Sequence, residues 1–327
     1  MRKPSSWSDS NRNIVTRPVP KQGRIGLLAG GGDFPIIFAK SIQQRGYEVT
    51  CIGIREEASL ELKQFCTEFH WAGISKIGRM IRLFHRSGIS HIVMAGKLTK
   101  SRIFAPRRLL HFLPDWRTLH LWYTYLKQDK KDDTLLLAVI QEFARDNFQF
   151  DSALDYCPEL LVKQGCLTRK QPTPSQMEDI LFGWKIAKEM GRLDIGQSVI
   201  VKEKATLAIE AIEGTDRAIQ RAGEFCPSGN FTVVKVEKPQ QDRRFDVPTI
   251  GVNTIETIHQ AGGKVLAIES NKTIILNEPE VVQLADQLGL CVVAIDEKQI
   301  TDRMEEEAQQ LLSLLLAFTE ALIRLLQ

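Results

Sequence analysis

The stretch that most constrains the fold is "GRIGLLAGGGDFPIIFAKSIQQRGYEVTCIGI", residues 23–54. It contains an apolar run, a triple-glycine turn, a segment with helical spacing of apolar residues and a second apolar run. This order predicts a strand, a helix and a parallel strand, the first unit of a doubly wound α/β sheet. "ISHIVMAGKL" (residues 89–98) predicts a further strand and "DDTLLLAVIQEFARD" a helix that starts at two aspartates. We therefore predict a Rossmann-like, parallel-sheet domain over residues 23–168.

The second half of the chain follows a different plan. "LTRKQPTPSQMED" has the composition of a hinge, and we predict a linker at residues 169–177. Beyond it, "QMEDILFGWKIAKEMGRLD" predicts a helix, "QSVIVKEKATLAIEAI" a hairpin, and "FTVVKVEKP", "KVLAIES" and "KTIILN" three more strands. These elements predict a mixed α/β domain over residues 178–300.

The two ends of the chain fall outside both predicted domains. Residues 1–22 are polar and proline-bearing, which predicts a disordered tail and fits neither a signal peptide nor a membrane anchor. Residues 301–327 predict a helix that is apolar over more than half of its circumference, so it must bury itself against its own domain, another subunit or lipid. Its apolar stretch "LLSLLLAF" is far shorter than the roughly 20 residues that span a bilayer. We expect a cytoplasmic protein that touches a membrane only at its surface.

Net charge and the spacing of cysteines and histidines exclude several classes of function. A net charge of +3 over 327 residues is too small for bulk nucleic-acid binding, so anion recognition must come from local clusters. The six cysteines form no C-x-x-C pair, and no histidine pair has zinc-ligand spacing, so we predict neither a disulfide framework nor a zinc site. One local cluster is "KLTKSRIFAPRR" (residues 97–108), which is followed by aromatic residues up to Tyr125. This segment could bind nucleic acid or an anionic lipid interface, or it could be an ordinary solvated surface without a partner.

The glycine turn at residues 29–35, "AGGGDFP", lies where nucleotide-binding folds wrap backbone amides around phosphate. Gly30 and Gly32 fit the G-x-G-x-x-G fingerprint, but Pro35 stands where the third glycine belongs. A phosphate site and a tight turn without a ligand both remain open.

Acidic residues gather in "EAIEGTDRAI", residues 210–219. Thr215 can cap the following helix, and Asp216 suits the positive end of its dipole. Helix capping does not explain Glu210 and Glu213, and this favours a site where carboxylates bind a metal or a water. "KVEKPQQDRRFDVPTIG" (residues 235–251) mixes cations and carboxylates in a way that suits a diphosphate with Mg²⁺, or only surface ion pairs.

At this point the sequence resembles a known family. "GWKIAKEMGRLDIGQSVIV", "LAIEAIEGTDRAIQRAG" and "KVEKPQQDRRFDVPTIG" resemble the C-terminal domain of the LpxI-type UDP-2,3-diacylglucosamine diphosphatases, and "GLLAGGGDFP", "VMAGKL" and "DDTLLLAV" resemble its N-terminal domain. The resemblance implies a Mg²⁺-dependent hydrolase of lipid A biosynthesis that splits its substrate into UMP and lipid X. It also implies that the substrate lies between the two domains and that Asp216, in the E-G-T-D motif, is essential.

Together with the resemblance, these motifs give a set of expected site residues. Asp216 is the expected catalytic residue. The expected substrate-binding residues are Gly30, Gly31, Gly32, Asp33, Lys97, Gln197, Thr215, Lys238, Gln241 and Arg244. The expected Mg²⁺ ligands are Glu213, Asp216, Asp242 and Asp246. The expected partners are an acylated UDP-sugar, the surface of the inner membrane and a second copy of the chain, without nucleic acid.

Two other functions remain open. A non-catalytic carrier of a UDP-sugar or acylated sugar would keep the glycine turn without needing Asp216. A nicotinamide-dependent dehydrogenase is undercut by Pro35 and by the end of the second predicted strand, where Arg55 precedes Glu56 and Glu57. The chain lacks a G-x-x-x-x-G-K-[ST] phosphate loop and paired Asp/His signatures, so we expect neither ATP use nor a His-rich two-metal site.

Overall fold

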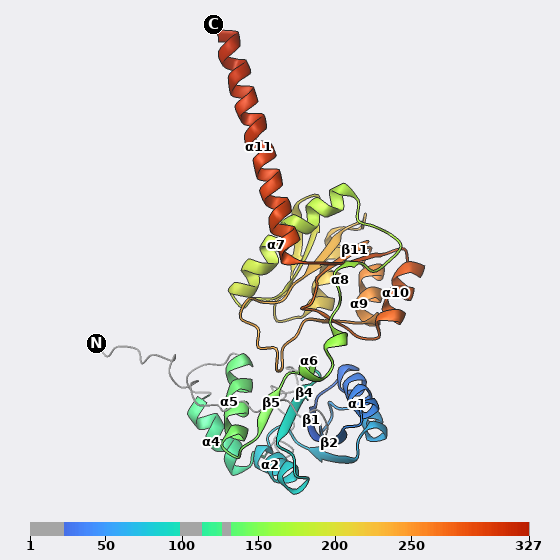
Figure 1. The fold of residues 1–327 in the computed structure, drawn as a ribbon, viewed down its shortest axis with the longest axis vertical. Coiled ribbons are helices and arrows are strands. Elements are labelled where there is room, and N and C mark those ends of the chain that lie inside the picture. The colour runs from blue at the N-terminus through green and yellow to red at the C-terminus, as the bar shows by residue number, and fades with distance from the viewer. Residues whose placement is uncertain (1–22, 99–112, 126–131, 327) are drawn as a thin grey trace, which may run out of the picture. The chain divides into compact units, whose positions relative to one another are not determined.

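A computed structural model describes residues 23–98, 113–125 and 132–326 (Figure 1). The chain divides into two compact units, one formed by Met1–Pro158 with Arg243–Phe245 and the other by Glu159–Asp242 with Asp246–Gln327. This division falls before the predicted 169–177 linker, where Thr173 caps a long helix through its side chain. The predicted 1–22 tail lies outside the described residues.

The N-terminal unit is built on a five-stranded sheet in the order β3-β2-β1-β4-β5, with every neighbouring pair parallel. The order reverses between β1 and β4, and such a switch point is where doubly wound sheets bind ligands. Its elements are β1 (Arg24–Ala29), α1 (Phe34–Gln44), β2 (Glu48–Ile54), the 3₁₀ helix η1 (Leu60–Phe65), β3 (Glu68–Ala72), α2 (Ile77–Arg86), β4 (His91–Ala95), α4 (Trp116–Tyr125), α5 (Asp132–Ala144), β5 (Gln149–Asp151), α6 (Ala153–Tyr156) and the 3₁₀ helix η3 (Pro158–Leu160). The predicted Rossmann-like parallel sheet is confirmed.

Apolar spacing explains how this unit packs. Every residue of β2 after Glu48 is buried, as expected for a parallel strand covered on both faces. α2 turns Met80, Ile81 and Phe84 into the core, and Phe84 is fully buried. Pro35, which departs from the dinucleotide fingerprint, falls in the first turn of α1, where its missing N–H costs nothing.

The C-terminal unit is built on a six-stranded mixed sheet in the order β6-β13-β11-β9-β7-β8. The central strands β9, β11 and β13 are parallel, while β7, β8 and β6 pair antiparallel with their neighbours. Its elements are β6 (Gly165–Cys166), α7 (Pro174–Arg192), β7 (Ser198–Lys202), β8 (Ala205–Ile209), α8 (Thr215–Phe225), β9 (Thr232–Lys235), β10 (Thr249–Ile250), α9 (Val252–Gln260), β11 (Val265–Glu269), β12 (Ile274–Ile275), α10 (Glu278–Gln287), β13 (Cys291–Ile295) and α11 (Glu297–Leu326). The predicted mixed α/β class is confirmed.

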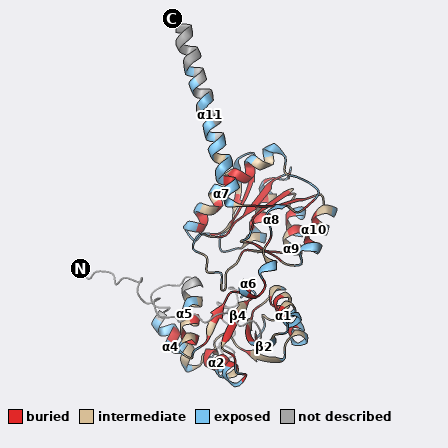
Figure 2. Cartoon of the chain, in the orientation of Figure 1, coloured by how far each residue is buried: buried red, intermediate tan, exposed pale blue. Residues whose placement is uncertain are grey.

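Helices cover both faces of this second sheet, and its inner strands β7, β9, β11 and β13 are buried over almost their whole length (Figure 2). Val233 packs on the face covered by α8, α9 and α10, and the next residue, Val234, packs on the face covered by α7 and the start of α11. This alternation follows from the two-residue period of a strand. The carboxyl ends of β8, β9, β11 and β13, which share one direction, lie at one edge of the sheet.

The predicted hairpin is confirmed as β7 and β8. Its two turn residues, Glu203 and Lys204, have φ of 51° and 59°, the conformation of a type I′ turn. The buried carboxylate of Asp179 accepts the Lys204 N–H at 2.7 Å, which supports a turn made without glycine.

Two details differ from the sequence predictions. "KTIILN" forms only β12, which pairs with β10 outside the main sheet. The sequence patterns above assigned no strand to Glu68–Ala72 or Cys291–Ile295, which form β3 and β13. α5 begins at Asp132 as predicted, although the side chains of its first residues lie outside the described part of the chain. None of the described helices combines the length and apolarity needed to cross a bilayer.

Candidate active site

The C-terminal unit brings several predicted residues to one edge of its sheet. β8, β9 and β11 run in the same direction and end at Ile209, Lys235 and Glu269. β7 runs the opposite way, so its first residue, Ser198, pairs with Lys235 at this edge. The acidic loop that begins at Glu210 therefore emerges beside the carboxyl ends of parallel strands, where open α/β sheets bind ligands.

Thr215, the first residue of α8, is the centre of a hydrogen-bonded cluster. Its hydroxyl donates to Oε1 of Glu210 at 3.0 Å, accepts from Nζ of Lys235 at 2.9 Å and lies 3.3 Å from the Ser198 hydroxyl. Lys235 and Ser198 are buried, which shields these bonds from water. Gly214 is the N-cap residue, so the prediction that Thr215 caps the helix is wrong. The Thr215 side chain instead anchors the start of α8 to the sheet.

The three acids at residues 210–216 have different environments. Glu210 binds Thr215 through Oε1, while its Oε2 is buried with no hydrogen-bond partner among the described residues. Glu213 forms an ion pair with Arg221, with 2.8 Å between Oε1 and Nη2. Asp216 is exposed in the first turn of α8, and its carboxylate makes no hydrogen bond or ion pair within the described part of the chain. Of the three, Asp216 has the carboxylate that is available to a ligand.

Two predicted glutamines carry unsatisfied buried atoms. Gln197 lies directly before β7, and its Oε1 has no partner in the ranges that the structure describes. Gln241 lies in the loop after β9, where Oε1 accepts the Lys238 N–H at 2.9 Å and Nε2 is unpartnered in the same ranges. A buried polar atom without a partner costs about 1–3 kcal/mol, so each is an atom that a water or a bound ligand would satisfy.

The motif at residues 238–246 is divided between the two units. The Lys238 ammonium lies 2.9 Å from Oδ1 of Asp194. The Asp246 N–H donates to the Asp242 carbonyl at 3.0 Å, which closes a tight turn. Arg244 clusters with the N-terminal unit, whereas both aspartates cluster with the C-terminal unit. The C-terminal unit by itself therefore contributes Lys238 and the two aspartates.

In the N-terminal unit, the predicted glycine turn is bridged to the turn after β4. The Gly30 N–H donates to the last carbonyl of β4 at 2.8 Å, and Gly31 and Lys97 exchange two backbone hydrogen bonds of 2.8 and 2.9 Å. A Cβ on Gly30 would lie 2.6 Å from the Lys97 carbonyl oxygen, so this close approach requires glycine. Two amides that were predicted to bind phosphate are thus used within the fold. The exposed Gly32 and Asp33 are the part of the turn that a phosphate can reach.

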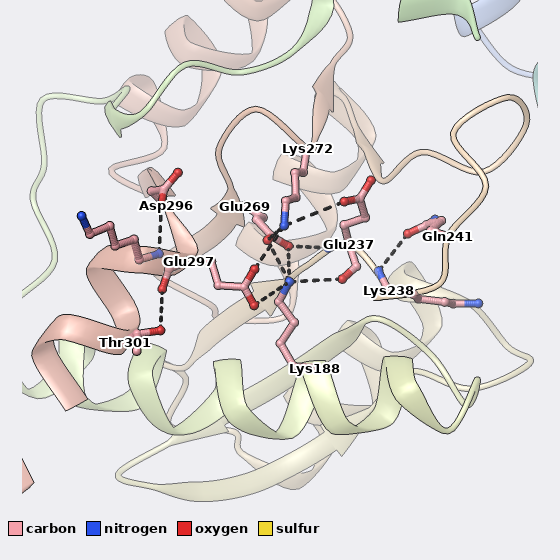
Figure 3. Close-up of polar contacts among 10 residues, drawn as sticks. Lys188, Glu237, Lys238, Gln241, Glu269, Lys272, Asp296, Glu297 and Thr301 are labelled. Carbon is pink, nitrogen blue, oxygen red and sulfur yellow. Dashed lines mark hydrogen bonds and ion pairs between the residues drawn. The ribbon is translucent and has the colours of Figure 1, made fainter. Parts of the chain in front are cut away.

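Figure 3 shows a charged cluster that the sequence predictions missed. Glu269, the fully buried last residue of β11, lies 2.8 Å from Nζ of Lys188 and 2.7 Å from Nζ of Lys272. Its Oε2 also accepts the Glu237 N–H at 2.8 Å. Glu297, the first residue of α11, lies 3.3 Å from Lys188 and 3.1 Å from Lys272. The cluster therefore connects α7, β11 and α11 at the carboxyl edge of the sheet.

The charges in this cluster stabilise one another. Burial would raise the pKa of Glu297, but Lys188 and Lys272 outweigh burial and lower it. Burial would likewise lower the pKa of Lys272, but Glu269 and Glu297 raise it. The sequence did contain an indication of this cluster. Glu269 ends the apolar run "VLAIE", and an acid in such a run needs a partner when it is buried. The sequence did not identify that partner, because Lys188 lies 81 positions away from Glu269.

The residues at this edge fit one mode of Mg²⁺ binding. In the described ranges, no three His, Cys, Asp or Glu side chains form a group that could hold a metal ion. Mg²⁺ is often held by only one or two carboxylates, together with water and substrate phosphates. The unengaged carboxylate of Asp216 and the unpartnered Oε2 of Glu210 suit that mode. Metal ligation by Glu213, Asp242 and Asp246 stays a prediction.

Comparisons with known proteins cover most of both units. Residues 24–160 match the family model of the LpxI N-terminal domain, and residues 163–293 match that of the LpxI C-terminal domain. The UDP-2,3-diacylglucosamine pyrophosphatase LpxI of Caulobacter vibrioides is 30% identical over 284 residues, which cover 84% of this chain and 99% of that protein.

A shorter similarity extends to purine biosynthesis proteins. The bifunctional protein PurH of Persephonella marina is 28% identical over 134 residues, 39% of this chain and 23% of that protein. PurH of Gloeothece citriformis is 30% identical over 132 residues, 39% of this chain and 22% of that protein. Both matches cover a minor part of each protein, so they carry no functional argument here.

Proposed function

The chain belongs to the LpxI family, and from this premise we propose that it hydrolyses the diphosphate bond of UDP-2,3-diacylglucosamine to UMP and 2,3-diacylglucosamine 1-phosphate, in lipid A biosynthesis. Both family models and a relative of nearly full length support the assignment. The observation that carries it is the environment of Asp216, an exposed and unengaged carboxylate at the strand edge where a substrate can reach it.

The surroundings of Asp216 suit the cleavage of a diphosphate. The cluster around Thr215 fixes the first turn of α8, so the backbone that carries Asp216 does not have to reorganise when substrate binds. The N-terminus of a helix favours an anion, and the buried ammonium of Lys235 adds positive charge beside it. Preorganised positive charge of this kind stabilises the negative charge that develops on the diphosphate oxygens during hydrolysis.

Mg²⁺ would neutralise phosphate charge and lower the pKa of a bound water when present. In this proposal Asp216 would hold the ion, and Glu210 would supply the Oε2 atom that has no hydrogen-bond partner among the described residues. If Asp216 instead orients the attacking water, Asp216→Asn will lower the maximal rate without changing the Mg²⁺ concentration that gives half of it. A metal ligand requires that concentration to rise, so a Mg²⁺ titration of the variant separates the two roles.

The decisive measurement is UMP release from UDP-2,3-diacylglucosamine in detergent micelles with Mg²⁺. We expect Asp216→Asn to lower kcat by about 10²–10³-fold, the usual cost of removing one group that stabilises a transition state. Glu224→Gln, at an exposed acid near the other end of α8, is the matched control and should retain full activity. A fully active Asp216→Asn variant would refute the assignment of the site.

The alternative of a non-catalytic acyl-sugar carrier makes a different prediction in the same assay. Such a protein would bind the substrate, release no UMP and lose no binding when Asp216 is replaced. The nicotinamide-dehydrogenase alternative is weakened by the engagement of the Gly30 and Gly31 amides within the fold.

The acylated substrate extends the proposal to a membrane. Each CH₂ group of an acyl chain contributes about 0.8 kcal/mol to partitioning into an apolar environment, so the substrate resides in a bilayer. We propose that the protein meets this substrate by peripheral contact with the inner membrane. That both domains hold the substrate, that the protein is cytoplasmic and that it is a homodimer stay predictions.

A further inference from the structure

Helix α4 exposes an unusual concentration of apolar side chains. Trp116, Trp122 and Tyr123 are 81%, 60% and 71% exposed, and Leu113 and Leu119 are exposed beside them. Single exposed apolar side chains are common on protein surfaces, but five within eleven residues form a contiguous stretch of the kind that marks an interaction site. Figure 2 shows exposed residues along this helix.

The outward direction of these side chains follows from how α4 is anchored. Leu121 is its buried core residue, and Thr118 on the same side donates to the Ser75 carbonyl at 2.9 Å. The Ile77 N–H at the start of α2 donates to the Thr118 hydroxyl at 3.3 Å. Asp115 accepts from the Thr118 N–H at 3.0 Å and so caps the helix. With this side fixed against the unit, helical spacing turns Trp116, Leu119 and Tyr123 to the opposite side.

The neighbouring helix α2 contributes positive charge. Its exposed side carries Arg79, Arg82 and Arg86 at helical spacing, and its sequence contains no acid. None of the three guanidinium groups forms a hydrogen bond or ion pair within residues 23–98, 113–125 and 132–326. The nearby acid Asp146 is already bound by Arg117. The Asp115 carboxylate accepts the Arg79 N–H at 3.2 Å and offsets part of this charge, so the exposed side of α2 presents a net positive charge next to an exposed aromatic helix.

We propose that the exposed sides of α2 and α4, called here the α2–α4 surface, dock the protein on an anionic lipid bilayer. Tryptophan and tyrosine rings are amphipathic and settle at the level of the lipid headgroups, and arginines are attracted to anionic lipids. The biological sense of the proposal rests on the proposed acyl-sugar substrate, but its test does not depend on turnover.

A lipid surface fits these observations better than nucleic acid does. Proteins that bind single strands stack successive bases on aromatic rings along a basic groove. Here the exposed aromatic side chains of α4 lie beside the exposed Leu113 and Leu119, which offer a base neither a stacking plane nor a hydrogen bond. The basic side chains lie on a separate helix, α2. Apolar side chains flanked by arginines match the acyl and headgroup layers of a bilayer.

Sedimentation of the full chain with vesicles tests the proposal. We expect binding to vesicles that contain phosphatidylglycerol, weak binding to phosphatidylcholine alone, and loss of binding at high salt. Replacing Arg79, Arg82 and Arg86 by glutamine should weaken partitioning by about fivefold for each residue. Trp116→Ser with Trp122→Ser should weaken it further, whereas Phe225→Ser, at an exposed aromatic residue of the C-terminal unit, should have no effect.

Fluorescence reports the contact directly. Insertion of Trp116 and Trp122 should shift their emission to shorter wavelength, and lipids brominated on the acyl chain should quench it. Trp116→Phe with Trp122→Phe keeps the apolar surface and should remove most of both signals while binding persists. Emission that stays constant on addition of anionic vesicles would overturn the proposal.

Other outcomes would also overturn it. Binding of a single-stranded oligonucleotide that the arginine variants abolish, without binding to vesicles, would make the α2–α4 surface a nucleic-acid site. Concentration-dependent self-association that Trp116→Ser abolishes would assign it to a second copy of the chain. UMP release from micelles separates the two proposals. For the wild-type chain, vesicle binding without UMP release would refute only the proposed function, and UMP release without vesicle binding would refute only the docking surface.

Discussion

Replacing Glu269 by glutamine removes the charge at the centre of the cluster shown in Figure 3 while keeping the size of the side chain. The wild-type carboxylate is fully buried and is bound by Lys188, Lys272 and the Glu237 N–H. Removing one partner of a buried ion pair typically costs about 3–5 kcal/mol. Both lysines keep Glu297 as a partner, and Lys272 is partly exposed, so we expect the lower end of that range, about 3 kcal/mol.

Because the chain has two units, one global free energy of unfolding is not well defined. We therefore specify pulse-labelled hydrogen exchange across a urea series, with peptides from β9 and β11 as reporters and peptides from β1 and β2 as the internal reference. The Glu269→Gln variant should lower the urea midpoint of the first pair only. If the urea midpoints of the β1 and β2 peptides fell as much as those of the β9 and β11 peptides, the destabilisation would not be local to the cluster.

Glu189→Gln is the matched control. Its carboxylate pairs with Arg192 at 2.9 Å on the exposed side of α7, and such a surface pair contributes about 0–1 kcal/mol. If Glu269→Gln proves no more destabilising than this control, the cluster does not stabilise the unit as argued. A triple variant, Lys188→Met, Glu269→Leu and Lys272→Met, should be more stable than Glu269→Gln, because it removes the charges of Glu269 and of both its lysine partners together.

Three further predictions concern single contacts. Thr215→Val removes the hydroxyl that Lys235 contacts and should destabilise the C-terminal unit by about 1–3 kcal/mol, whereas Thr215→Ser should not; equal urea midpoints for the two variants would contradict this. The pKa of Glu297 is lowered from its usual 4.5 by its lysine partners, so its stabilising contribution is complete above pH 4.5 and is lost as the pH falls through the lowered value. Glu297→Gln should therefore reduce the acid-induced loss of exchange protection at the start of α11, and an unchanged pH profile would contradict the ion pair. Gly30→Ala places a Cβ 2.6 Å from the Lys97 carbonyl oxygen and should destabilise the N-terminal unit by about 1–3 kcal/mol, so an unaltered thermal midpoint for that unit would refute the close approach.

The parts of the fold that sequence predicted well are those coded by local patterns. The strand, glycine turn and helix of residues 23–54 could be identified from apolar spacing alone, because both sheet faces are covered and the strands read as continuous apolar runs. The β7–β8 hairpin was likewise predicted from two apolar runs, although its turn uses Glu203 and Lys204 rather than glycine. Its stabilising contact with Asp179 is a long-range one and could not be predicted.

The candidate site was predictable in its residues more than in their contacts. The E-G-T-D motif predicted Asp216 as the catalytic residue, and this stays a prediction. The structure shows that its carboxylate is exposed and makes no hydrogen bond or ion pair with the residues that the structure describes. The role of Thr215 was misjudged because its partners Ser198 and Lys235 come from two strands that only the folded sheet brings together. The cluster around Glu269 was missed for the same reason.

The ion cluster also changes how the last helix should be understood. The LpxI family match ends at residue 293, and α11 begins four positions later with Glu297. Lys188 and Lys272 each contact both Glu269 and Glu297, so the added segment and the matched domain share one pair of counterions. Lifting the base of the helix from the sheet would remove Glu297 from both lysines, and their remaining carboxylate contacts would be Glu269 for Lys188, and Glu269 with Glu237 at 4.0 Å for Lys272. A tether attached at the far end of α11 would therefore pull on the same strand edge that presents the candidate catalytic aspartate.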